Sequence, residues 1–235
     1  IACHNQSYVD KYDLLRGIKE GGTFLLNTLW KGEELERNLP NHVKRTLARN
    51  HVKFYTIDAV SIAQELGLGN RTNTVLQAAF FKLSGVLPVD EAVQYMKDAI
   101  THSYFKKGDK VLNMNYAAVD RGLQSVEEIR VPDSWKDLPD EPLEQAAGVP
   151  DYVRDVLIPV NAQAGDKIPV SKFLSFADGV TEVETSKYEK RGIAVDVPQW
   201  LPDNCIGCNQ CSLVCPHAAI RPLLFSKEEA EQAPA

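Results

Sequence analysis

The sequence has no excess of basic residues, no long apolar run and few cysteines, and each shortage excludes a class of protein. Lys and Arg number 26 against 32 Asp and Glu, for a formal net charge of -6, so we expect no nucleic-acid partner. No apolar run approaches the roughly eighteen residues that a membrane-spanning helix needs, so we expect no membrane partner. Only 5 of the 235 residues are cysteine, and four of these lie close together. That usage favours a reducing cytoplasm over an oxidising compartment.

The most informative feature present is a run of cysteines in the order C-x2-C-x2-C-x3-C, followed by Pro216. Its members are Cys205, Cys208, Cys211 and Cys215, called the cysteine run below. The spacing is the bacterial ferredoxin pattern, in which three thiolates bind one iron–sulfur cluster and the fourth typically binds another. The sequence therefore predicts [4Fe–4S] clusters, with all four cysteines as metal ligands.

Zinc and disulfides are the alternatives for these thiols. Structural zinc sites usually use two Cys or His pairs separated by a dozen or more residues. Cysteines at intervals of three crowd one side of one loop, which suits a cluster better than a tetrahedral ion. His217 follows Pro216 directly, and we interpret it as a surface residue. The fifth cysteine, Cys3, lies roughly two hundred residues away, which disfavours a disulfide.

The cysteine set is unfinished, because a two-cluster ferredoxin needs two such runs and this chain has one. Ile1–His4 resembles the end of a buried strand, and no initiator Met precedes it. We therefore expect a segment of a longer protein. The alternative is a stand-alone electron-transfer or zinc-binding subunit that a partner chain completes.

Apolar β-prone stretches alternate with helical ones in residues 1–130. We expect strands at 23–28 and 52–57, and helices at 10–20, 33–50 and 59–66. Pro40 should divide the second helix, and Asp58 can cap the third. This order predicts part of a doubly wound, parallel α/β sheet.

Apolar stripes at helical spacing predict three longer helices in the same region, and we interpret the stripes as core. The stripes are Val75, Leu76, Ala79, Phe80 and Leu83; Val89, Ala92, Val93, Met96 and Ile100; and Val111, Met114, Ala118 and Val119. The glycines in residues 66–71 follow a helix and lack a third glycine. They therefore predict a helix end and a turn, not a dinucleotide-binding loop.

The composition changes near Val131. Six prolines and many acidic residues in 131–169 predict an irregular connector on the surface, with at most a short helix at 150–157. Residues 170–200 contain short β-prone pieces, including 192–195. The expected organisation is an α/β domain over 1–130, a Pro- and acid-rich connector over 131–197, and the start of a ferredoxin-like α+β iron–sulfur module over 198–235.

The sequence resembles the pyruvate:ferredoxin (flavodoxin) oxidoreductases. The specific resemblance is in KYEKRGIA at 187–194, V-P-x-W at 197–200 and the cysteine run through His217. Weaker front-half motifs are similar to the family's gamma-type domain: Ala2-Cys3-His4, GGxFLLN at 21–27, FYxIDA at 54–59, R-x-N at 71–73, QxxFF at 77–81 and NxxxVD at 115–120. Residues 178–185 depart from the family, which tends to have a Pro- and Gly-bearing turn there.

The resemblance implies a homodimeric enzyme that oxidatively decarboxylates pyruvate with coenzyme A to acetyl-CoA and carbon dioxide. It implies thiamine diphosphate and Mg²⁺ bound outside this segment, and electrons leaving through [4Fe–4S] clusters to ferredoxin or flavodoxin. Cys205, Cys208 and Cys211 would hold one cluster and Cys215 another. The chain is expected to contact the remaining domains of the parent polypeptide. The resemblance assigns no catalytic residue and no coenzyme A contact to this segment, so the segment alone is expected to be inactive.

Overall fold

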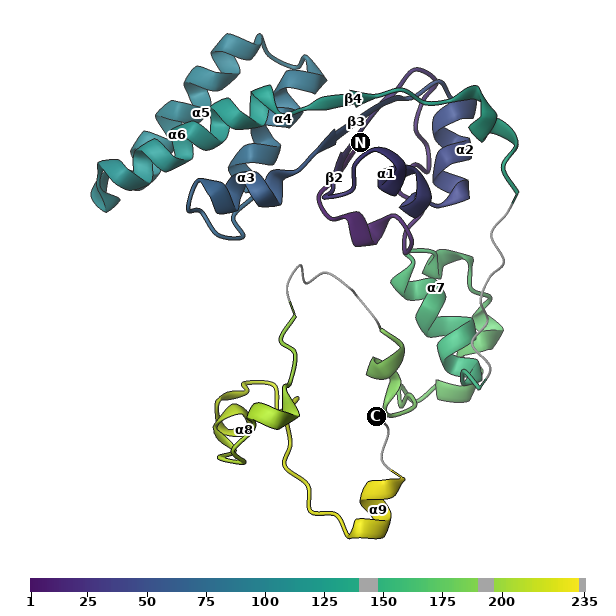
Figure 1. The fold of residues 1–235 in the computed structure, drawn as a ribbon. Coiled ribbons are helices and arrows are strands. Elements are labelled where there is room, and N and C mark those ends of the chain that lie inside the picture. The colour runs from purple at the N-terminus through teal and green to yellow at the C-terminus, as the bar shows by residue number, and fades with distance from the viewer. Residues whose placement is uncertain (140–147, 190–196, 233–235) are drawn as a thin grey trace. The chain divides into compact units, whose positions relative to one another are not determined.

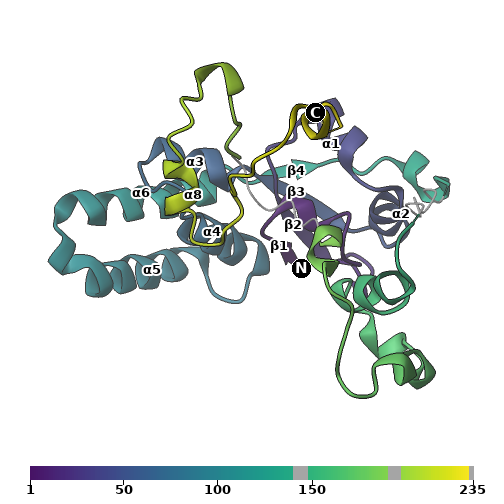
Figure 2. The ribbon, with the colours of Figure 1, turned by 90° about the horizontal axis from the view of Figure 1, so that it is seen from below.

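The computed structural model describes residues 1–139, 148–189 and 197–232, and the chain divides into two units, Ile1–Ile193 and Ala194–Ala235. The first unit contains the sheet and most of the helices (Figures 1 and 2). The second contains the cysteine run. Among the described residues, no helix combines the length and the apolar character that crossing a membrane requires.

A four-stranded sheet, in the order β1-β2-β3-β4, organises the first unit. The strands are β1 Ala2–Cys3, β2 Thr23–Asn27, β3 Lys53–Ile57 and β4 Glu127–Ile129. The first three are parallel, which confirms the predicted α/β class, and β4 is antiparallel to β3. The sequence does not predict β4, because Glu-Glu-Ile is not an apolar run. An antiparallel edge strand on a mostly parallel sheet is common.

Short helices follow β2 and β3 as predicted. Pro40 separates α1 (Gly32–Asn38) from α2 (Asn41–Arg49). After β3, the Asp58 side chain accepts a hydrogen bond of 2.9 Å from the backbone N–H of Ser61, which caps α3 (Ala59–Glu65).

Three longer helices complete this part of the unit: α4 (Asn73–Ser84), α5 (Val89–Tyr104) and α6 (Asp109–Gln124). The predicted stripes are largely buried, and Val75 and Val119 have no exposed surface. Phe80 and Val89 are exceptions, with 46% and 38% of their surface exposed. In α4 and α5, one residue of each predicted stripe is therefore exposed to solvent and does not belong to the core.

Both faces of the β2–β3 pair are covered. Phe24 and Leu26 point into a core shared with α1 and α2, and Phe24 stacks on Phe54 at a centroid distance of 5.6 Å. Leu25 and Ile57 point to the opposite core, which α3, α4 and α6 supply. Strands buried on two faces are continuously apolar, as the sequence of β2 is.

The helix predicted over 10–20 is wrong. Residues 5–18 instead form turns, with a 3-10 helix at Gln6–Tyr8. Gly17 has a φ of +78°, a left-handed conformation that interrupts a right-handed helix. Val9 and Leu15 are buried in the core, so they fix these turns against the sheet.

The connector is attached to the first domain at its start, which its proline-rich composition does not predict. Trp135, in a 3-10 helix at Asp133–Asp137, is 5% exposed and packs in the core beside α2. Its indole N–H donates to Glu36 Oε1 at 3.2 Å. Arg45 donates to the carbonyl oxygens of Leu138 and Pro139, each at 2.8 Å.

The predicted short helix at 150–157 is longer than expected. A π-helical turn at Val153–Leu157 continues directly into α7 (Ile158–Asn161), so the helical run extends beyond residue 157. Residues 170–200 contain no strand in their described part, but 3-10 helices at Val170–Phe176 and Thr185–Tyr188. The β-prone piece 192–195 lies outside the described residues.

An ion cluster and an aromatic contact join these connector helices. The carboxylate of Asp155 accepts from Arg154 and from Lys172, each at 2.7 Å, and Tyr152 packs edge-on against Phe176. The two cations lower the pKa of Asp155 to about 2. The ion cluster is therefore present at neutral pH and is lost only as the pH falls below the ordinary carboxyl range, toward 2.

The second unit has little secondary structure in its described residues. It contains a 3-10 helix at Pro202–Asn204, then α8 (Gln210–Val214) and α9 (Lys227–Glu231). None of its described residues is buried, and Leu213 is 84% exposed. This part of the chain therefore has no apolar core of its own.

A close backbone approach between α4 and α6 gives a test of the fold. A Cβ atom at Gly122 in α6 would lie 2.5 Å from the Val75 carbonyl oxygen and 3.0 Å from the Ala78 Cβ in α4. Gly→Ala ordinarily stabilises a helix by about 1 kcal/mol. We expect Gly122→Ala to lower the free energy of unfolding instead, by about 1–3 kcal/mol, because it overpacks this contact. Urea denaturation measures the change.

Asn113→Ala is the matched control, because Asn113 is exposed on the same helix. It should change stability by less than about 0.5 kcal/mol. A Gly122→Ala protein as stable as the parent would show that α4 and α6 are not in backbone contact.

Candidate iron–sulfur site

The first two members of the cysteine run lie on a curled loop, and the third, Cys211, lies in the first turn of α8 (Gln210–Val214). The backbone N–H of Cys205 donates to the Pro202 carbonyl at 3.1 Å, which closes the turn before the run. Gly207 and Asn209 then adopt left-handed conformations, with φ of +68° and +58°. Gly and Asn are the residues that tolerate this geometry best. These two residues turn the backbone between Cys205 and Cys211.

The last two cysteines are one helical turn apart. Cys211 lies within α8, and Cys215 is the residue that ends it. The backbone N–H of Ala219 donates to Cys215 Sγ at 3.3 Å. His217 is exposed, as the sequence predicts.

Hydrogen-bond donors surround the first and last sulfur atoms. The pKa of Cys215 is lowered by backbone hydrogen bonds from Ile220, His217 and Ala219. The pKa of Cys205 is lowered by a backbone hydrogen bond from Gly207 and then by one from the Trp200 side chain. Donors of this kind favour the thiolate, which is the form that binds iron.

The donor set fits an iron–sulfur cluster in its chemistry. Cys205, Cys208 and Cys211 are exposed, Cys215 is half-buried, and none is in a disulfide. Within residues 1–139, 148–189 and 197–232, no three His, Cys, Asp or Glu side chains converge closely enough to hold a metal ion. The loop therefore supplies four free thiols without gathering them around one point.

Cys3 has a different character. It is 4% exposed, and its Sγ donates to the Asn5 carbonyl oxygen at 3.1 Å. Burial raises its pKa, which disfavours the reactive thiolate. His4, its neighbour on the strand, is exposed, so the two do not form a nucleophile and base.

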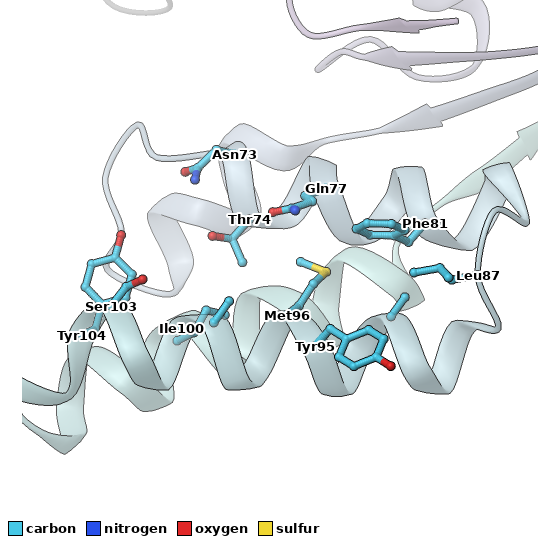
Figure 3. Close-up of a pocket in the computed structure, with 12 residues that line it drawn as sticks. Asn73, Thr74, Gln77, Phe81, Leu87, Tyr95, Met96, Ile100, Ser103 and Tyr104 are labelled. Carbon is cyan, nitrogen blue, oxygen red and sulfur yellow. The ribbon is translucent and has the colours of Figure 1, made fainter.

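A groove of about 250 Å³ lies between α4 and α5 (Figure 3). Asn73, Thr74, Ser103 and Tyr104 lie toward one end of it, and apolar side chains including Phe81 and Leu87 lie toward the other. The lining residues are Asn73, Thr74, Gln77, Phe81, Leu87, Ala92, Tyr95, Met96, Ala99, Ile100, Ser103 and Tyr104. None of them is an acid, histidine, cysteine or cation. The groove can bind a molecule by shape and amide hydrogen bonds, but it lacks the usual acid–base and metal-binding groups.

A second, more polar cleft of about 520 Å³ lies at the carboxyl ends of β2 and β3, where α/β sheets commonly bind ligands. Five charged residues line it: Lys31, Asp58, Glu65, Arg121 and Glu127. Arg121 pairs with Glu65 at 2.9 Å, and Asp58 caps α3. The sequence analysis predicts neither cleft, because the lining residues come from separate elements and form no motif.

Alkylation distinguishes the cysteine run from Cys3. We expect iodoacetamide, in the presence of a chelator, to label the run in the native chain and to spare Cys3, because Cys3 is buried and its pKa is raised. Fragment mass spectra of tryptic peptides locate each label. A sample in urea should be labelled at all 5 cysteines. Equal labelling of Cys3 with and without urea would contradict its buried position.

Comparisons with known families divide the chain into three parts. The profile described as pyruvate ferredoxin/flavodoxin oxidoreductase matches residues 1–125. A domain of unknown function called EKR matches 139–194, and a 4Fe-4S binding domain matches 198–221. The last match contains the whole cysteine run.

Curated relatives match along the whole chain. The pyruvate:ferredoxin oxidoreductase of Moorella thermoacetica is 58% identical over 234 residues, and the pyruvate-flavodoxin oxidoreductase of Enterobacter agglomerans is 51% identical over 235 residues. Both alignments cover 100% of this chain and 20% of the relative, so the chain spans about a fifth of the length of these relatives.

A solved structure, the pyruvate oxidoreductase subunit PORC of Thermotoga maritima, aligns with 55% of this chain and 64% of its own. The TM-score is 0.43 at 19% identity, which is too low to carry an argument. The family profile, in contrast, matches more than half of the chain, through the sheet and the helices that cover it. The chain therefore belongs to the pyruvate ferredoxin/flavodoxin oxidoreductase family.

Proposed function

We propose that this chain is a segment of a pyruvate:ferredoxin or pyruvate:flavodoxin oxidoreductase. In that reaction pyruvate loses carbon dioxide, and its two-carbon remainder is oxidised by two electrons and joins coenzyme A as acetyl-CoA. The electrons leave one at a time for ferredoxin or flavodoxin. The observation that carries the proposal is the 58% identity to an oxidoreductase of this name along the whole chain, cysteine run included.

The role proposed for the second unit is electron transfer. [4Fe–4S] clusters supply one-electron steps when they are bound. Cys205, Cys208 and Cys211 would bind one cluster, and Cys215 a second. The curled loop through Gly207 carries Cys205 and Cys208, the first turn of α8 carries Cys211, and Cys215 lies at the other end of α8. The backbone N–H of Ala219 would orient the Cys215 sulfur and stabilise its negative charge.

The first unit is proposed to be a structural domain of the same enzyme, without a catalytic residue in this segment. Thiamine diphosphate and Mg²⁺ would bind elsewhere in the parent protein, and coenzyme A would be the acyl acceptor. The parent protein is proposed to be a cytoplasmic homodimer. The uncharged groove between α4 and α5 is consistent with a domain that binds but does not transform a substrate.

Cysteine variants of the complete protein test the ligand assignment. Cys205→Ser, Cys208→Ser or Cys211→Ser should each disturb one and the same cluster, and Cys215→Ser should disturb the other. Electron paramagnetic resonance of the reduced, anaerobically purified variants separates the two signals. We expect each variant to lose about four iron atoms per chain at most, because one cluster remains.

Ser212→Ala is the matched control, because Ser212 lies inside the run but is not a proposed ligand. It should keep both signals and the pyruvate-dependent reduction of ferredoxin. If Cys215→Ser and Cys208→Ser disturb the same signal, the crossed assignment is wrong. Stoichiometric zinc in place of iron in the anaerobic wild-type protein would exclude the electron-transfer role itself.

A further inference from the structure

The polar cleft at the carboxyl edge of the sheet lies where the chain leaves β2 and β3 toward opposite faces. The residues after β2 lead to α1 and α2, which cover one face, and Asp58 leads to α3, which covers the other. Connections that diverge in this way from neighbouring parallel strands leave a crevice between them, and α/β proteins commonly bind ligands there. The cleft of about 520 Å³ occupies this position.

Hydrogen bonds fix the wall of the cleft that follows β2. The backbone N–H of Thr28 donates to the Ile57 carbonyl at 3.0 Å, which ties this wall to the end of β3. The backbone N–H of Trp30 donates to Thr28 Oγ1 at 3.1 Å. This wall contributes the half-buried Trp30 and the exposed Lys31 to the lining, on a backbone that is held in place without a ligand.

The opposite wall, formed by the end of β3 and the start of β4, is held in the same way. The Asn27 side chain accepts a hydrogen bond of 3.0 Å from the backbone N–H of Ala59, which fixes the chain as it leaves β3. Glu127 is paired with Thr56 in the antiparallel ladder between β3 and β4. The ladder therefore fixes the backbone from which the Glu127 carboxylate lines the cleft.

Two charges of opposite sign in this lining have no partner in the part of the chain that the structure describes. Arg121 and Glu65 pair with each other, and Asp58 caps α3. Lys31 and Glu127, in contrast, make no ion pair there. Lys31 follows β2 and Glu127 begins β4, and β3 lies between these strands, so the two charges come from opposite walls. A single exposed charge is ordinarily just solvated, but a cation and a carboxylate across one cleft are complementary to a molecule that carries both signs.

We infer that this cleft binds a zwitterionic small molecule of the α-amino acid class, whose carboxylate contacts Lys31 and whose ammonium group contacts Glu127. Trp30 and Ile62 supply apolar surface in the lining for the side chain of such a ligand. The site is independent of the proposed reaction, because it requires no cluster, no thiamine diphosphate and no coenzyme A.

Isothermal titration calorimetry of the complete protein at pH 7, with three matched probes, tests this inference. L-phenylalanine carries both charges, 3-phenylpropionate lacks the ammonium group, and phenethylamine lacks the carboxylate. We expect L-phenylalanine to bind, and each analogue to bind at least about fivefold more weakly, because each leaves one charge of the cleft without a partner. Absence of L-phenylalanine binding, or an analogue that binds as tightly, would overturn the inference without any variant having to fold.

Two variants of exposed residues place the binding in this cleft. Lys31→Met and Glu127→Gln should each weaken L-phenylalanine binding by about fivefold or more. Lys31→Met should not weaken phenethylamine further, and Glu127→Gln should not weaken 3-phenylpropionate further, because these probes lack the group that the altered residue contacts. Glu128→Gln is the matched control, since Glu128 is the next residue of β4 and its side chain projects from the other side of the strand. It should bind all three probes as the wild type does, and wild-type affinity for L-phenylalanine in Lys31→Met or Glu127→Gln would refute the site.

Discussion

Burial of the β2–β3 pair on both faces is the constraint on which the first unit depends. Side chains of a strand alternate between the two faces, so Phe24 and Leu26 need cover on one side and Leu25 on the other. A parallel connection between the two strands requires a crossover, and α1 and α2 supply it together with the cover for the first face. The helices that follow β3 cover the second face. A polar substitution at any of these three strand positions would bury a polar group without a hydrogen-bond partner, which is destabilising.

The two units obtain their order from different sources. In the first, apolar burial dominates, and some of the buried polar groups are bonded across elements. Asn27, for example, donates to the His4 carbonyl at 2.9 Å and accepts from the Ala59 N–H at 3.0 Å, so it joins the end of β1 to the start of α3. The described part of the second unit has no buried residue, so burial cannot stabilise it in the same way. A bound cluster would supply folding free energy to such a loop, because small metal-binding modules commonly fold only as the metal binds.

Local sequence signals predict the elements that local chemistry determines. Pro40 divides a helix because it lacks an N–H, and Asp58 begins one because its carboxylate can accept from the first turn. The turns at 10–20 are missed because a left-handed glycine, Gly17, lies within an otherwise helical pattern. Tertiary contacts determine the burial of Trp135, which no local pattern records. At the candidate site the spacing of the cysteines predicts the chemistry of the ligands, but not the donors around them.

The close approach at Gly122 has a mechanical consequence for the groove in Figure 3. Because Val75 and Gly122 meet at backbone distance, any side chain larger than hydrogen at position 122 would force α4 and α6 apart and displace one wall of the groove. The groove has α4 as one wall and α5 as the other. Its width therefore depends on the separation of α4 from α5. Met96 and Ile100 of α5 pack against Ala78 of α4 and Val119 of α6, so a change at the α4–α6 contact would be transmitted to the groove through this shared core.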